Sequence, residues 1–319
     1  MKKVIKILGL LLGVMVVLGL LGFVIINSSG IPNYPVEAPE YHAKATPEAL
    51  ARGEKLVSML CAGCHLNKES GNLVGHQMMD APPEFGTIYS ANITADPTYG
   101  IGKWTDGEIL YLLRTGIKRD GRYAPPYMAK LPTMADEDIN AIIAFLRSGH
   151  PLVAADATPD KMTEPSFLTK LLCRVAFKPF PMPDAPIPAP DSSNTVALGK
   201  YLAHNLDCFS CHSADFKTND FLDPTKSAGY FAGGNKPLNL KGQVVLTPNL
   251  TPDEETGIGS WSKEQFVRAL KYGIVGGDQP ALQYPMAPYS LLTDHEAGAI
   301  YEYLMTIPPI KNKVERSVY

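Results

Sequence analysis

The feature of this 319-residue sequence that most constrains its fold is a five-residue cysteine motif that occurs twice. The copies are Cys61-Ala62-Gly63-Cys64-His65 and Cys208-Phe209-Ser210-Cys211-His212. The pattern C-x-x-C-H is typical of covalent attachment of a c-type haem. Two thiols three positions apart on a helical turn can each add to one vinyl group of the same porphyrin, and the following histidine can bind the iron as its proximal ligand.

A C-x-x-C pair can also be a redox pair or half of a zinc site. Neither half of the chain has a second pair of closely spaced cysteines to complete a zinc cage, so we predict two covalently bound haem c groups. The predicted attachment and iron-binding residues are Cys61, Cys64, His65, Cys208, Cys211 and His212. The fifth cysteine, Cys173, lies in an apolar segment and is predicted to be a buried hydrophobic residue.

The N-terminal segment contains an unbroken apolar run, residues 7–26. At a rise of ~1.5 Å per residue this run can cross a hydrocarbon core of ~30 Å. A cleavable signal peptide has a shorter apolar region, of ~7–15 residues, and a small-x-small cleavage site. We therefore expect a retained anchor in the inner membrane. Lys2, Lys3 and Lys6 precede the run, and the positive-inside rule then predicts that the chain after Gly30 lies in the periplasm.

The two halves of the chain repeat more than the cysteine motif, which indicates an internal duplication. Asn92-Ile93-Thr94-Ala95-Asp96 corresponds to Asn249-Leu250-Thr251-Pro252-Asp253. At the same spacing in both halves, Gly100-Ile101-Gly102-Lys103-Trp104 corresponds to Gly257-Ile258-Gly259-Ser260-Trp261.

Each half also has the sequence pattern of helices separated by glycine- and proline-rich loops. Thr105 with Glu108, and Ser262 with Gln265, form predicted capping boxes that open a helix after each tryptophan. No clear alternating strand pattern is present, so the sequence predicts an all-α fold of two small helical domains, each wrapped on its haem. The expected helices are residues 47–59, 105–116 and 136–147 in the first half and 196–206, 262–273 and 293–305 in the second.

The domain organisation predicted from these patterns has four segments. They are an N-terminal membrane anchor (1–30), a first haem domain (40–150), a proline-rich linker with one short apolar helix (151–194) and a second haem domain (195–312).

A sixth iron ligand must come from elsewhere in each half, and methionine would raise the reduction potential and close the site. The candidates are Met78, Met79, Met128 and Met134 in the first half and Met286 and Met305 in the second. Met128 and Met286 coincide when the repeats are superposed, and both follow prolines that stiffen the loop. We predict that Met128 and Met286 are the ligands, whereas Met134 lies opposite Leu292 and fits packing better.

The sequence leaves open the roles of one histidine and of the two tryptophans. His76 follows the first haem motif, where a distal group could reach the iron, but it has no partner in the repeat. Trp104 and Trp261 occupy equivalent positions and could hydrogen-bond a haem propionate through the indole N–H or simply pack in the core.

Taken together, the C-x-x-C-H, N-[IL]-T-x-D and G-I-G-x-W motifs and the Pro-Met loops resemble the di-haem class I cytochrome c family. That family includes the cytochrome subunits of membrane-bound alcohol and sugar dehydrogenases, which usually carry three haem motifs where this chain has two. The resemblance implies two tandem class I cytochrome c domains with His/Met-ligated haems. It also implies electron relay from a dehydrogenase or quinol-oxidising complex to a terminal oxidase.

We therefore expect an electron carrier without substrate chemistry of its own. One alternative is a di-haem redox enzyme with one catalytic haem, either a peroxidase or a sulfur-compound dehydrogenase with Cys173 as a distal ligand. Another is a redox sensor, although residues 310–319 do not resemble a signalling domain. The formal net charge of −3 gives no indication of nucleic-acid binding, which would call for a basic face.

Overall fold

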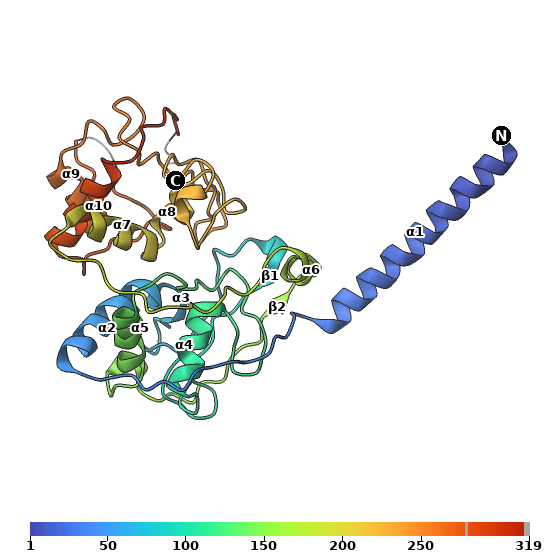
Figure 1. Ribbon diagram of the computed structural model, residues 1–319, viewed down its shortest axis with the longest axis horizontal. Helices are drawn as coiled ribbons and strands as arrows, with labels where there is room; N and C mark the ends of the chain where they lie inside the picture. The colour runs from blue at the N-terminus through green and yellow to red at the C-terminus, as the bar shows by residue number, and fades with distance from the viewer. Residues whose placement is uncertain (278–279, 316–319) are drawn as a thin grey trace.

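The computed structural model describes residues 1–277 and 280–315 and is mainly helical (Figure 1). A long helix projects from a body made of two helical units, one above the other in Figure 1. In chain order the elements are α1 (Lys2–Ser29), α2 (Pro47–Leu60), α3 (Ala62–His65), η1 (Pro83–Phe85), β1 (Gly86–Thr87), α4 (Asp106–Thr115), α5 (Asp136–Leu146), η2 (Pro151–Val153), β2 (Glu164–Pro165), α6 (Phe167–Val175), α7 (Thr195–Asn205), α8 (Cys208–His212), η3 (Pro224–Lys226), α9 (Lys263–Tyr272) and α10 (Asp294–Leu304).

The two units share one helix arrangement, in which the first and last helices cross closely. In the first unit α2 packs on α5, and in the second α7 packs on α10. A Cβ atom added at Gly53 of α2 would lie 2.0 Å from the carbonyl oxygen of Ala141, and one added at Gly199 of α7 would lie 1.9 Å from that of Ala299. Both crossings therefore depend on a glycine that lets the two backbones touch.

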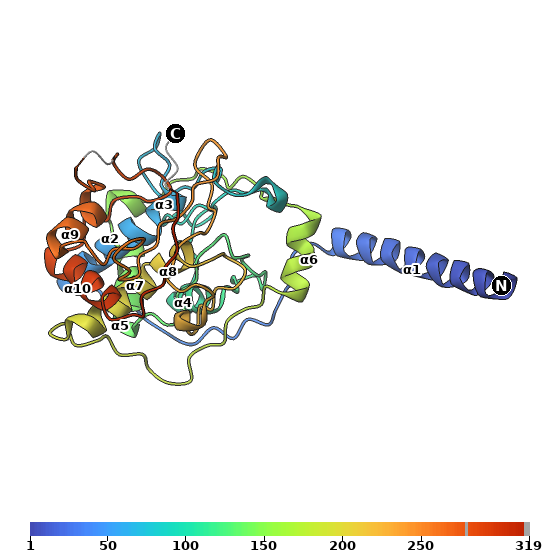
Figure 2. The same ribbon diagram turned by 90° about the horizontal axis from the view of Figure 1, so that it is seen from above.

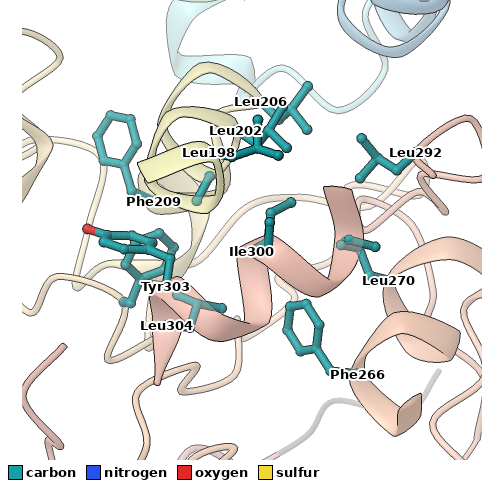
Figure 3. Close-up of a cluster of buried hydrophobic side chains, with 14 of the residues drawn as sticks. Leu198, Leu202, Leu206, Phe209, Phe266, Leu270, Leu292, Ile300, Tyr303 and Leu304 are labelled. Carbon is teal, nitrogen blue, oxygen red and sulfur yellow. The ribbon is translucent and has the colours of Figure 1, made fainter. Parts of the chain in front are cut away.

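The apolar core of each unit lies between these helices. In the second unit, Leu198 and Leu202 of α7 face Ile300 and Leu304 of α10, and Phe266 of α9 closes one side (Figure 3). The first unit has a matching core, formed by Leu56, Val57, Ile109, Leu113, Ile139, Ile142, Phe145 and Leu146. The predicted all-α fold is thus confirmed, and the described strands are one antiparallel pair of two residues each, β1 with β2.

The helices begin and end close to the predicted residues, and one of the two predicted capping boxes is incomplete. Thr105 and Thr293 form full capping boxes with the residues three positions later, and Gly116 and Gly273 end α4 and α9 in the left-handed conformation. The capping box predicted at Ser262 is only half formed. Ser262 accepts the backbone N–H of Gln265, but the Gln265 side chain donates instead to the carbonyl of Val275.

The segment between the units is ordered against the first unit over much of its length. The side-chain amide of Asn92 donates to the carbonyls of Asp156 and Thr158, at 2.9 and 3.0 Å, and the Asn92 backbone N–H donates to the Asp160 carboxylate. The segment then forms α6, which confirms the predicted short helix. Cys173 of this helix is a fully buried free thiol, as predicted.

Helix α1 extends away from the body, and none of its residues is buried (Figures 1 and 2). Within the described residues it is the one helix long and apolar enough to cross a membrane. A retained anchor and a signal sequence share this length, composition and position near the N-terminus.

The two units meet in an interface with an apolar part and a polar part. Met59, Leu60 and Tyr201 pack against both cores. Beside them, Arg52 pairs with Asp138 of its own unit at 2.8 Å and with Glu296 of the other unit at 3.1 Å. These contacts join the end of α2, next to the first cysteine motif, to the second unit.

Candidate haem sites

The first cysteine motif is a short helix that continues directly from α2. Cys61 ends α2, and α3 carries Cys64 and His65. The Nδ1 atom of His65 lies 2.7 Å from the carbonyl oxygen of Ala91. Because a carbonyl can only accept a hydrogen bond, Nδ1 carries the proton and Nε2 presents a free lone pair. Burial lowers the pKa of His65, which favours the neutral imidazole that binds a metal.

The second motif repeats this arrangement. His212 of α8 is buried, and its Nδ1 atom lies 2.9 Å from the carbonyl oxygen of Pro248. Burial again lowers the pKa of this imidazole. A hydrogen bond from the second ring nitrogen to a carbonyl is the usual way in which a metal-binding histidine is oriented.

The repeated N-[IL]-T-x-D motif positions these carbonyls, since Ala91 and Pro248 each precede its asparagine. The side-chain oxygen of Asn92 accepts from the backbone N–H of Thr94 at 2.9 Å and from its hydroxyl at 2.7 Å. The corresponding distances from Asn249 to Thr251 are 2.9 and 2.8 Å. The two loops therefore fold in the same way, and each places a carbonyl oxygen next to the Nδ1 atom of its histidine.

The first glycine of each G-I-G-x-W motif has a steric role in the same loop. A Cβ atom at Gly100 would lie 2.3 Å from the carbonyl oxygen of Thr94, and one at Gly257 would lie 2.1 Å from that of Thr251. In the sequence these motifs mark the repeat, but they do not predict the carbonyls that orient the histidines. Their position directly before the repeated asparagine was the available signal.

The cysteines of both motifs are suited to covalent attachment. All five cysteines of the chain are described, and all are free thiols. Burial raises the pKa of the four motif thiols, Cys61, Cys64, Cys208 and Cys211. Each motif thus combines two unpaired neutral thiols with an imidazole whose Nε2 is free, and this donor set fits a covalently held haem.

The predicted methionine ligands lie in loops with the same turn. The backbone N–H of Met128 donates to the carbonyl of Pro125 at 3.0 Å, and that of Met286 donates to Gln283 at 3.0 Å. Both side chains are half-buried. Met286 packs against the second core, as Cys208 does, whereas Met128 lies outside the corresponding first cluster.

The two methionine loops are held by different contacts. Lys130 ties the first loop, because its Nζ atom donates to the carbonyl of Pro125 at 2.9 Å and lies 4.9 Å from the centre of the Tyr123 ring. In the second loop the hydroxyl of Tyr284 donates to the carboxylate of Asp80, a residue of the first unit.

The other candidates are placed as follows. Met134 is 1% exposed within the first core, which fits its expected packing role, and Met79 is 56% exposed. Trp104 and Trp261 pack at equivalent edges of the two cores, and their indole N–H groups have no hydrogen-bond partner among the described residues. The Nδ1 atom of His76 is buried and also lacks a partner in the described part of the chain.

Comparisons with known proteins agree with this fold. The family model described as Cytochrome c matches residues 50–150 and 196–308. The chain is 31% identical over 263 residues to the cytochrome c subunit of alcohol dehydrogenase (quinone) from Gluconacetobacter polyoxogenes, an alignment that covers 78% of this chain and 54% of that protein. It is 31% identical to the fructose dehydrogenase cytochrome subunit of Gluconobacter japonicus, covering 83% of this chain and 54% of that subunit.

A third relative matches nearly end to end. The diheme cytochrome c-type protein of Cereibacter sphaeroides is 28% identical, and the alignment covers 87% of this chain and 92% of that protein. By contrast, the chain spans about half the length of the two dehydrogenase subunits.

Two repeated helical units, each with a C-x-x-C-H helix and a carbonyl-oriented histidine, define a haem protein with two covalent sites. The chain belongs to the cytochrome c family. It is an electron-transfer cytochrome with two covalently bound haem c groups, and the two dehydrogenase relatives above are named as cytochrome subunits.

Proposed function

We propose that this cytochrome is held in the inner membrane by α1 and carries electrons on the periplasmic side between a dehydrogenase and a terminal oxidase. The dehydrogenase is inferred from the relatives, which are named as subunits of alcohol, fructose and gluconate dehydrogenases. The membrane location is inferred from α1 and from the lysines before it. The proposed segments are an anchor (1–30), two haem domains (40–150 and 195–312) and a connecting segment (151–194).

The proposed haem-binding residues are the same in both domains. Cys61, Cys64, Cys208 and Cys211 hold the haems, His65 and Met128 bind the first iron, and His212 and Met286 bind the second. Each bound haem supplies a one-electron couple. The observation that carries this proposal is the matched turn of the two methionine loops, with the Met N–H 3.0 Å from the carbonyl three residues earlier in both.

The interface between the units supports electron exchange between the two haems. Leu60, which directly precedes Cys61, packs against the second core, and so does Cys208. Tyr284, two residues before Met286, donates a hydrogen bond across the interface to Asp80. The residues flanking both proposed haem sites thus meet at one boundary, which would keep the cofactors in a fixed relationship.

The alternative of a catalytic haem is less well supported. Such an enzyme needs one iron with an open or exchangeable position, and neither half lacks the loop methionine. Cys173, the proposed ligand in the sulfur-compound alternative, lies on the buried side of α6 and is 0% exposed. These observations favour two closed, six-coordinate sites.

Carbon monoxide binding tests this proposal. The reduced holoprotein should bind carbon monoxide slowly and to a small extent at both haems, because a methionine sulfur occupies the sixth position. The oxidised protein should likewise show no turnover of hydrogen peroxide. Rapid binding of one equivalent of carbon monoxide per chain, together with peroxide turnover, would instead identify a catalytic haem.

A further inference from the structure

We propose that α6 lies on the outer surface of the membrane beside the end of α1 and binds anionic phospholipid headgroups there. This inference rests on the proposed role of α1 as a retained anchor.

Helix α6 is attached to the last turns of α1. The rings of Phe23 and Phe167 lie 4.7 Å apart between centroids. Lys170 Nζ donates to the Asn27 side chain at 2.8 Å, and Arg174 donates to the hydroxyl of Ser29 at 2.6 Å. Because Phe23 belongs to the apolar run, these contacts place α6 at the level where the proposed span leaves the hydrocarbon.

The direction of α6 suits a position in the plane of the interface. Figure 2 shows α6 running across the axis of α1, and Figure 1 shows the same helix nearly end-on beside the base of α1. If α1 crosses the bilayer, α6 therefore lies along its surface. Helices of this kind bury an apolar face at the boundary between headgroups and acyl chains.

The apolar face of α6 is not covered by the protein body. Thr169 and Cys173 form the buried side, at 1% and 0% exposure. On another side, Leu168 and Val175 are 39% and 66% exposed, and Leu171 lies between them on the same stripe. Apolar residues at positions i, i+3 and i+7 share one helix face, so these three leucine and valine side chains form a continuous strip.

The charges around this strip are mainly positive. The helix contains Lys170 and Arg174 and no acidic residue, and the exposed Lys161 and Lys178 flank it. Glu164 and Glu84 are exposed acidic neighbours, and Glu84 belongs to η1, which packs against α6. Basic side chains next to a membrane span favour anionic lipids, whose headgroups carry the complementary charge. A second attachment of this type would hold the haem domains in one orientation to the membrane, which a single tether cannot do.

A thiol-accessibility experiment tests this placement on the full-length holoprotein in vesicles. Val175→Cys and, as a matched control, Leu240→Cys are introduced separately into a Cys173→Ala background, and reaction with a charged maleimide is timed. Leu240 is 51% exposed in the second unit, far along the chain from α6. In vesicles containing phosphatidylglycerol, the thiol at position 175 should react at least about tenfold more slowly than the thiol at position 240, since the lipid interface excludes the charged reagent.

Four further measurements decide between explanations. Vesicles of phosphatidylcholine alone, or the Lys161→Gln/Lys178→Gln variant, should reduce the protection at position 175. Equal reaction rates at positions 175 and 240 would overturn the proposal, as would protection that disappears when the protein is diluted in excess lipid, because a second copy would then be the occupant. An intact mass lacking residues of α1 would overturn it too, while leaving the haem spectra and the proposed electron-carrier function unaffected.

Discussion

The hydroxyl of Tyr201 lies 2.6 Å from the carboxylate of Asp138 and donates a hydrogen bond to it across the interface between the two haem units. The relationship has a counterpart, in which Lys55 of the first unit pairs with Glu296 of the second. Tyr201 and Lys55 each lie two residues after the crossing glycine of their helix, and Asp138 and Glu296 are both the third residue of the last helix. The duplicated units therefore meet through equivalent surfaces, as in a two-fold symmetric dimer.

Removing Asp138 should destabilise this interface strongly. Its side chain is 3% exposed, and it pairs with Arg52 and accepts from Tyr201. We expect Asp138→Ala to lower the free energy of unfolding by about 1–3 kcal/mol, because the Tyr201 hydroxyl loses its acceptor and Arg52 keeps only Glu296 as a partner. Denaturant unfolding of the holoprotein measures the change. Glu255→Ala, which breaks an exposed pair with Lys311, is the control and should change stability by less than about 1 kcal/mol.

The crossing of α2 and α5 in the first unit should not tolerate a side chain at Gly53. A Cβ atom at Gly53 would lie 2.0 Å from the Ala141 carbonyl oxygen, so Gly53→Ala must push α2 away from α5. We expect a loss of about 1–3 kcal/mol or more in thermal or denaturant unfolding. Gly149→Ala is the matched control, since nothing lies within 4 Å of the added carbon there. Equal stability of the two variants would show that the helices do not cross as described.

A buried histidine should make stability depend on pH. His204 contacts the hydroxyl of Tyr230, and burial lowers its pKa from 6.5 to about 4. The unfolded chain therefore binds a proton that the folded chain does not, and stability should fall by up to about 3 kcal/mol as the pH drops from 6.5 towards 4. Compared with the native chain, His204→Gln should flatten this dependence, whereas His42→Gln at an exposed site should preserve it.

The methionine assignment predicts a selective spectral loss. Met286→His should keep the second iron low-spin but remove its share of the methionine-to-iron charge-transfer absorption, so that about half of the near-infrared band remains. Met134→Leu should leave the band unchanged, because Met134 is a core residue at 1% exposure. Full intensity in Met286→His would assign the band to another methionine.

The repeated motifs predicted much of this fold because their chemistry is local. Spacing places both cysteines and the histidine on one turn, and Thr105 with Glu108 marks the start of α4 without reference to the rest of the chain. The methionine loops emerged from superposing the two halves. The two loops share one backbone turn at Met128 and Met286, whereas the assignment of these methionines as iron ligands stays a prediction.

Other features depend on contacts between distant residues and could not be read from one segment. The carbonyls of Ala91 and Pro248 have no side-chain signature, so their bonds to His65 and His212 follow only from the folded loop. Gln265 was expected to complete a capping box, but the tertiary fold brings the Val275 carbonyl within 3.4 Å of its side chain.

The position of α6 against α1 was likewise not evident from sequence. It joins Phe23 to Phe167, residues separated by the whole first haem unit. A short apolar helix in a proline-rich segment gave no indication of which surface it would occupy.

Both irons are proposed to be closed by a histidine and a methionine, which suits an electron carrier. Near-infrared and electron paramagnetic resonance spectra of the oxidised holoprotein, quantified per haem, test it most directly. We expect two low-spin centres and a methionine-to-iron band with the intensity of two haems. One high-spin, His/His or Cys/His centre, with a band of half that intensity, would contradict the account and point to substrate chemistry at that haem.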